Sequence, residues 1–334
     1  MRIMIELLAC VVGVAAIACL SALRATASDD LGTDKETSFS TRDIACDVSY
    51  EGYNRSAKLN SRYRWDCDGD ERQLSGNGVP DHPVGRFPNR SNPTAIREQR
   101  VSASTPLNPT LGSSLTQVGP RGAYVYALNS VKFDPATAGA CPTGADEASD
   151  CNLARGGGPW RIEALGQDVF DFGEDMNKAH VQPTGEYHYH GVPEGMLEKA
   201  GISDANPRMA LVGWAGDGFP VYARYCYVDP MDPASGVKVC KGSYVLDTSP
   251  DAGRPSTEWF PLGAFTSDWN YREGSGDLDE CNGRSGATPE FPEGIYYYMA
   301  TDSYPYFSRC IKGVFEARRH SPPDRRPPFN RRPR

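Results

Sequence analysis

The chain has 334 residues, of which 39% are hydrophobic, and a formal net charge of −8 at pH 7. This length is sufficient for one large domain, or two small ones, with a hydrophobic core. The segment 318–334 holds seven Arg and one Asp, a local charge of +6, so the rest of the chain is near −14. Such an acidic body argues against a nucleic-acid-binding protein.

The N-terminal segment has the order of an export signal. Arg2 precedes an apolar run over 3–23 and then Ala25-Thr26-Ala27, the small-x-small pattern that signal peptidases cut. We therefore expect residues 1–27 to be a signal peptide, the protein to be secreted or periplasmic, and the mature chain to lack a membrane span. The alternatives are a retained anchor, because the run is just long enough to cross a bilayer, and a lipoprotein cut before Cys19.

Eight cysteines follow the signal segment. An even number in an exported chain favours disulfides. The cysteines come as four successive pairs, and we expect neighbours to be joined: Cys46 to Cys67, Cys141 to Cys151, Cys226 to Cys240, and Cys281 to Cys310. The alternative is a site in which cysteines bind zinc, but the sequence contains no Cys-x-x-Cys, the spacing typical of such sites.

Composition divides the remaining chain into three parts. Residues 28–59 are interpreted as an N-terminal leader containing the first cysteine, and residues 60–316 as the main domain. The segment 317–334 is rich in Pro and Arg and is predicted to be disordered. The alternative for this tail is docking to an acidic partner.

Short apolar runs between turn residues predict the secondary structure of the main domain. Gly and Pro are frequent and long helical periodicity is missing. A short helix is predicted at 194–200, ended by Gly201. Strands are predicted at 123–133, 160–165, 209–214, 219–227 and 295–301. The expected fold is a mostly β (or α+β), antiparallel, loop-rich, disulfide-stabilised single large domain.

Three of the five histidines lie within eleven residues, on both sides of the turn signal Pro183-Thr184-Gly185. With a three-residue loop, His180 would face His188 across a hairpin. Because side chains alternate between the faces of a strand, one face would carry His180, Gln182, Glu186, His188 and His190, and the other Val181, Tyr187 and Tyr189. A register shift of one residue would move His180 to the second face.

The shared face predicts a metal site. Directly opposed Cβ atoms lie about 5 Å apart, so His180 and His188 could hold one ion, with His190 as the third ligand. Three imidazoles and an open position suit Zn(II) or Cu(II). The alternative is a surface or hydrogen-bonded cluster without metal.

Catalytic residues are unknown from the sequence, but two carboxylates are candidates. Glu186 could act as a general base beside a metal-bound water. Asp217 could be an outer partner of a histidine nitrogen or a base. The alternative for Asp217 is a purely structural strand-to-turn position before Gly218.

Several strings resemble the YHYH domain family, over roughly residues 60–316. They are Gly-Glu-Tyr-His-Tyr-His at 185–190, Asn-Gly-Val-Pro-Asp-His-Pro-Val-Gly-Arg-Phe-Pro-Asn at 77–89, Ala-Leu-Asn-Ser-Val at 127–131, Asp-Gly-Phe-Pro-Val-Tyr at 217–222, Tyr-Tyr-Tyr at 296–298 and Phe-Ser-Arg-Cys at 307–310. Asn129-Ser130 departs from the usual Asn-Gly. The resemblance implies an exported domain, carries no established activity, and adds His82 as a candidate fourth ligand, with a turn histidine beside Pro83 as the alternative.

These observations leave three hypotheses for function. The first is an exported protein that binds a divalent transition metal, Cu or Zn. The second is a metal-assisted hydrolase, and the third is a non-catalytic structural or ligand-binding module. The sequence contains no Gly-x-Ser-x-Gly, His-Glu-x-x-His or phosphate-binding loop, which argues against familiar enzyme classes.

Overall fold

A computed structural model describes residues 38–118, 124–135, 137–154 and 156–315. The predicted signal peptide and the Pro/Arg segment 317–334 lie outside the described residues. Within those ranges the chain is mostly β, with one short α-helix and two 3-10 turns, η1 (Ala148–Asp150) and η2 (Thr266–Asp268). The predicted fold class is confirmed.

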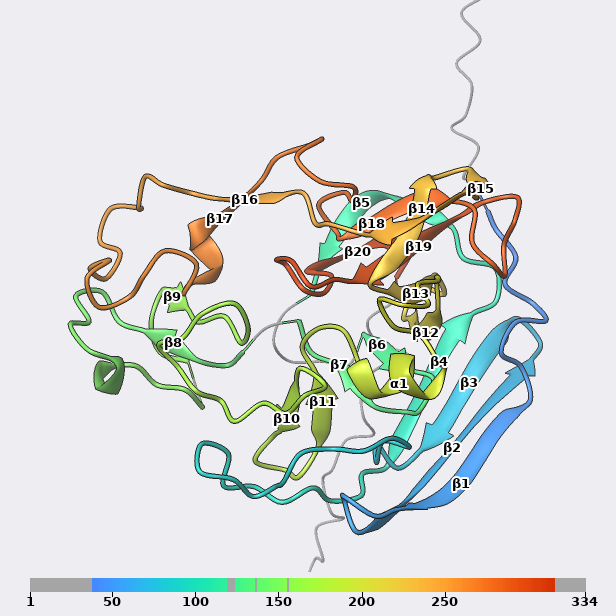
Figure 1. The fold of residues 1–334 in the computed structure, drawn as a ribbon, viewed down its shortest axis with the longest axis horizontal. Helices are drawn as coiled ribbons and strands as arrows, with labels where there is room; N and C mark the ends of the chain where they lie inside the picture. Colours follow the sequence, from blue (N-terminus) through green and yellow to red (C-terminus); the bar gives the residue numbers. More distant parts are fainter. Residues whose placement is uncertain (1–37, 119–123, 136, 155, 316–334) are drawn as a thin grey trace, which may run out of the picture. The chain divides into compact units, whose positions relative to one another are not determined.

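The largest sheet has eight strands in the order β10-β11-β7-β6-β12-β13-β19-β18 (Figure 1). Most neighbours are antiparallel, but β11 with β7 and β13 with β19 run parallel. The strands are β6 (Val125–Ala127), β7 (Lys132–Phe133), β10 (Ala179–Val181), β11 (Tyr187–Tyr189), β12 (Leu211–Ala215), β13 (Pro220–Ala223), β18 (Gly283–Gly286) and β19 (Ile295–Ala300).

A second sheet comes from the N-terminal part of the described chain. Its order is β1 (Val48–Asn54), β2 (Leu59–Asp68), β3 (Glu71–Gly76) and β4 (Val101–Pro106), all antiparallel. All seven residues of β1 pair with β2. The strand 48–54, which lies in the segment interpreted from the sequence as a leader, is therefore part of this sheet.

Four two-stranded sheets complete the fold, and disulfides reinforce them. They are β5 (Leu111–Gln117) with β20 (Cys310–Gly313), β8 (Ala140–Cys141) with β9 (Trp160–Arg161), β14 (Tyr225–Asp229) with β15 (Asp232–Val239), and β16 (Tyr244–Leu246) with β17 (Trp269–Tyr271). The disulfides are Cys46–Cys67, Cys141–Cys151, Cys226–Cys240 and Cys281–Cys310. The expected pairing of neighbours is thus found.

Two predicted strands are each divided by a residue with positive φ. Ser130 (φ 66°) closes the turn between β6 and β7, where its amide donates to the carbonyl of Ala127 at 2.9 Å. Because glycine adopts this conformation without strain, the turn accounts for the Asn-Gly usually found at this place. Arg224 (φ 59°) separates β13 from β14 in the same way.

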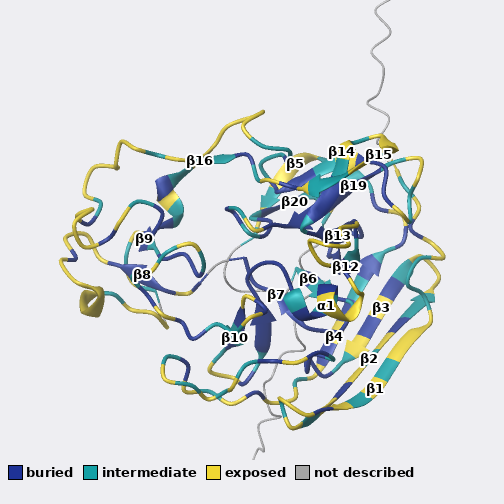
Figure 2. Ribbon diagram, viewed as in Figure 1, coloured by how far each residue is buried: buried dark blue, intermediate teal, exposed yellow. Residues whose placement is uncertain are grey.

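The core follows the eight-stranded sheet (Figure 2). Every residue of β11, β13 and β19 is buried, and helix α1 (Glu194–Lys199), at the predicted place, buries Leu197. Side chains on both faces of β11 are buried. Among the described residues, no helix is both long and apolar enough to cross a membrane.

Candidate metal centre

The hairpin of β10 and β11 has the register that the sequence predicted. His180 pairs with His188 and Val181 with Tyr187. The amide of Gln182 donates to the carbonyl of Glu186 at 2.9 Å, and the amide of Gly185 donates back to Gln182 at 2.8 Å. Gly185 has φ 90°, and a Cβ there would lie 2.7 Å from the side chain of Arg97, so the turn requires glycine.

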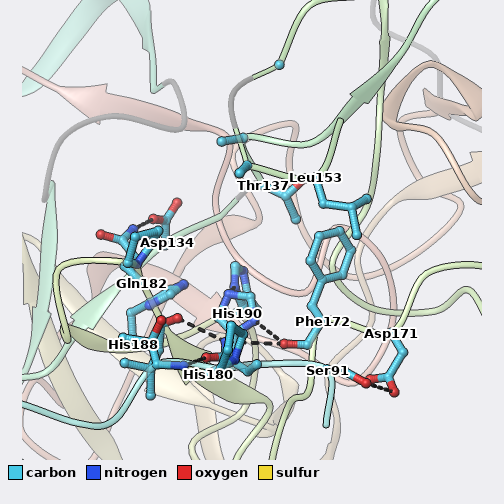
Figure 3. A pocket seen from close by; sticks show the side chains of 18 of the residues that line it. Ser91, Asp134, Thr137, Leu153, Asp171, Phe172, His180, Gln182, His188 and His190 are labelled. Carbon is cyan, nitrogen blue, oxygen red and sulfur yellow. Dashed lines mark hydrogen bonds between the residues drawn. The ribbon is translucent and has the colours of Figure 1, made fainter. Parts of the chain in front are cut away.

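His180, His188 and His190 meet on one face of this hairpin (Figure 3). Their ring centroids lie 4.6 to 4.7 Å apart. One ring nitrogen of each lies within 4.8 Å of the others, and the Nε2 atoms of His180 and His190 are 3.0 Å apart. The side chains expected to share a metal ion are therefore close enough to do so.

Main-chain carbonyls orient the rings. His180 Nδ1 lies 3.0 Å from the carbonyl oxygen of Phe172, and His188 Nδ1 lies 3.2 Å from that of Glu186. A carbonyl only accepts, so both Nδ1 atoms carry hydrogen and both Nε2 atoms keep a lone pair. His190 Nδ1 faces the main chain of Asp134, in a geometry outside a normal hydrogen bond.

Burial keeps these imidazoles neutral. It lowers the pKa of His180, and it lowers the pKa of His188 and of His190 well below the ordinary value, with the neighbouring histidines adding to the effect. Neutral imidazole is the form that donates a lone pair to a metal ion. The three side chains are thus available as ligands near neutral pH.

Strand β7 and the residue that follows it add two charged side chains, Lys132 and Asp134, that were not among the residues predicted from the sequence. It pairs in parallel with β11, which places Lys132 opposite His188. Lys132 Nζ lies 3.4 Å from Asp134 Oδ2 and 3.3 Å from Glu186 Oε2, and Gln182 Nε2 donates to Asp134 Oδ2 at 3.0 Å. The alternation Val-Lys-Phe-Asp at 131–134 was the available signal, because it puts both charges on one face.

A pocket of about 1020 Å³ opens over the histidines. It is lined by His180, His188 and His190 together with Lys132 and Asp134, and Figure 3 shows the three histidines and Asp134 among the lining side chains. The other lining residues come from several segments of the chain: Ser91 to Thr94, Thr137 and Ala138, Leu153, Ala154, Gly156, Gly157 and Arg161, Asp171 and Phe172, and Val181 to Pro183. The pocket gives small molecules access to the three imidazoles.

The two tyrosines of the motif anchor the opposite face. Tyr187 Oη donates to Asp175 Oδ2 at 2.7 Å, and Asn177 Nδ2 donates to Tyr187 Oη at 3.1 Å. Tyr189 Oη lies 2.5 Å from His82 Nε2 and accepts from Asn129 Nδ2 at 2.9 Å. The separated strings 77–89 and 127–131 therefore meet at the motif.

His82 does not join the three histidines. Its Nδ1 lies 2.9 Å from the carbonyl oxygen of Pro83, and its Nε2 faces Tyr189 Oη. Because the carbonyl only accepts, Nδ1 donates and Nε2 accepts from the tyrosine. Both nitrogens are used on the tyrosine face, so the expected fourth ligand is not placed at the candidate metal centre.

The two candidate carboxylates have other partners. Asp217 is buried and accepts hydrogen bonds from Tyr298 Oη (2.5 Å) and the amide of Gly313 (2.9 Å), and burial raises its pKa to about 6. It does not line the pocket. Glu186 directs its carboxylate to Lys132, whereas its carbonyl contacts His188. The outer partners found for the histidines are therefore main-chain carbonyls.

The fold and this site define a disulfide-bonded, mostly β domain with a buried three-histidine cluster beneath a pocket. Comparison with family models matches residues 102–313 to the YHYH protein family. The chain belongs to this family. The match begins in β4, so β1 to β3 and the string 77–89 lie before it. No curated protein and no solved structure matches the chain.

Proposed function

We propose that this exported YHYH protein binds one divalent transition-metal ion, Cu or Zn, through His180, His188 and His190. The observation that carries the proposal is the convergence of three neutral imidazoles, two of which donate Nδ1–H to main-chain carbonyls. Such outer hydrogen bonds fix the tautomer in which Nε2 is the ligand.

The contact between His180 and His190 supports a cation at this place. Since His180 Nε2 carries a lone pair, the 3.0 Å contact with His190 Nε2 needs a proton or a cation between the two atoms. If His190 supplies this proton from Nε2, its buried Nδ1 carries no hydrogen, because a neutral imidazole has only one N–H. That Nδ1 then lacks a full hydrogen bond, at a cost of about 1–3 kcal/mol. A metal ion would accept both lone pairs and leave hydrogen on Nδ1.

The dimensions suit a small tetrahedral ion. Zinc–imidazole bonds of about 2.0–2.1 Å correspond to nitrogen atoms roughly 3.3 Å apart in a tetrahedral site. The three side chains would leave a fourth position open towards the pocket. The hydrolase alternative receives less support, because Glu186 is paired with Lys132 and Asp217 lies elsewhere.

Export is part of the proposal. Four disulfides require an oxidising compartment to persist. Together with the N-terminal sequence pattern, they favour a secreted or periplasmic protein.

The test is metal stoichiometry after dialysis against Zn(II) or Cu(II), measured by inductively coupled plasma mass spectrometry. We expect about one ion per chain in the wild type. His188→Ala should weaken binding by more than about 100-fold, above the range usual for losing an outer partner. Tyr187→Phe, on the opposite face of the same strand, is the matched control and should keep full stoichiometry.

A triple substitution by alanine at 180, 188 and 190 completes the test. If this variant keeps one ion per chain and a native circular dichroism spectrum, the cluster is structural and the proposal is wrong.

A further inference from the structure

We infer that the metal-loaded site binds a small oxyanion or a similar anion, held between the metal ion and the ammonium group of Lys132. This inference rests on the proposed function and names the class of ligand that the open position would take. It comes from the charges buried beside the histidines.

The buried charges next to the cluster do not balance once a divalent ion is present. Lys132 and Asp134 have side chains only 8% and 5% exposed, and Glu186 is 23% exposed. One cation and two carboxylates give this group a charge of −1, and the neutral histidines add nothing. A divalent ion changes the total to +1.

More distant charges do not remove this imbalance. At the rim of the pocket, Arg161 and Asp171 have opposite signs, and the exposed Asp171 is screened by solvent. Arg309, whose charge reaches His190, is paired with Glu163 at 2.6 Å. Asp175 faces away, towards Tyr187 and the amide of Gly85.

A net positive charge in a buried site is costly unless a counter-charge enters. The fourth position of the ion opens to the pocket and would accept a donor oxygen or nitrogen. Lys132 lines the same pocket and lies opposite His188 on a neighbouring strand, at a typical strand spacing of about 4.8 Å. An anion on the metal would therefore also be within reach of the ammonium group.

The experiment uses the full mature chain loaded with Cu(II), titrated with azide and with inorganic phosphate at pH 7. Electron paramagnetic resonance and visible absorption report on ligands of the copper ion, and calorimetry gives the affinity. We expect wild-type protein to bind either anion only when loaded with metal. Lys132→Met should weaken binding at least tenfold, whereas Arg161→Met, which removes a cation at the rim, should have a smaller effect.

Two further variants separate contact from net charge. Glu186→Gln keeps Lys132 and raises the local charge, so it should tighten anion binding several-fold. The double variant Lys132→Met/Glu186→Gln has the wild-type net charge. It also removes the Glu186 carboxylate, which would lose its cation in the single variant Lys132→Met. It should still bind the anion weakly, because the ammonium contact is lost.

The outcomes distinguish the two proposals. If wild-type protein binds no Cu(II), the proposed function fails. If it binds Cu(II) but neither anion changes the spectrum, or if Lys132→Met or the double variant binds anions as the wild type does, the inference about Lys132 is overturned.

Discussion

Neighbouring residues of the motif at 187–190 have different tasks because side chains alternate along a strand. Tyr187 and Tyr189 make hydrogen bonds to Asp175 and to His82, while His188 and His190 turn towards the pocket. The tyrosines contact neighbouring loops on one face of the strand, and the two imidazoles lie on the other face. His180 on β10 supplies the third imidazole through the hairpin register.

At this scale the pH dependence of stability is predictable for metal-free protein. Burial lowers the pKa of His180, His188 and His190, whereas histidine in the unfolded chain titrates near about 6.5. Below that pH the unfolded chain binds more protons than the folded one. The contribution of these histidines to the free energy of unfolding is therefore fully present above about pH 6.5 and is lost as pH falls through the lowered pKa values.

Thermal melts of chelator-treated protein between pH 7.5 and 5 measure this loss, and the triple alanine variant should show a shallower dependence. Burial raises the pKa of Asp217 to about 6 and that of Glu174 to about 7. These two carboxyls make the protein more stable as pH falls, and they do so equally in the wild type and in the triple alanine variant. Bound metal should also be retained above about pH 7 and lost towards about pH 5. Equal pH profiles for the variant and the wild type would contradict the role assigned to the histidines.

At the scale of elements, the hairpin is positioned by a loop far from it in sequence. The segment 77–89 places His82 under Tyr189, and Asn129 in the β6–β7 turn donates to both Tyr189 and Asp81. Lys199, the last residue of α1, forms an ion pair with Asp81 and so joins the helix to the same network. The tyrosine face is therefore an anchoring surface.

Tyr189→Phe should destabilise the fold by about 1–3 kcal/mol, because the buried His82 Nε2 loses its hydrogen-bond partner and Asn129 Nδ2 loses one of its two acceptors. Tyr53→Phe is the control, since Tyr53 is 61% exposed, and it should change stability by no more than about 0.5 kcal/mol. Urea unfolding with the disulfides intact measures both. Equal stability of the two variants would show that the network does not anchor the hairpin.

At the scale of the molecule, four disulfides join successive cysteines and close loops of different length. Cys281–Cys310 spans 29 positions and Cys141–Cys151 spans 10. A crosslink restricts the unfolded chain more when it closes a longer loop. The contribution of each bond should therefore differ.

Replacing both cysteines of a pair by alanine tests this expectation. Loss of Cys281–Cys310 should cost about 3–4 kcal/mol, and loss of Cys141–Cys151 about 1 kcal/mol less, as measured by unfolding midpoints.

Denatured, unreduced wild-type protein that begins near Ser28 should show no reactive thiol in a thiol titration. Detection of two or more thiols per chain would refute the disulfide framework.

The sequence by itself determined the features that depend on local pattern. Alternation and a turn signal gave the register that pairs His180 with His188, and the order of cysteines gave the disulfides. The sequence pattern also located helix α1 and the strands β6, β7, β9, β12, β13, β14 and β19. These features involve residues a few to about thirty positions apart, where chain geometry leaves few alternatives.

Only the tertiary structure decided which distant segments meet. The parallel pairing of β7 with β11 brings Lys132 and Asp134 beside the histidines, and His82 and Asp217 are directed to other partners. Pairing of β1 with β2 likewise brings residues 48–54 into a sheet. These contacts depend on how whole elements pack, and a residue's own neighbours in sequence carry no signal for that choice.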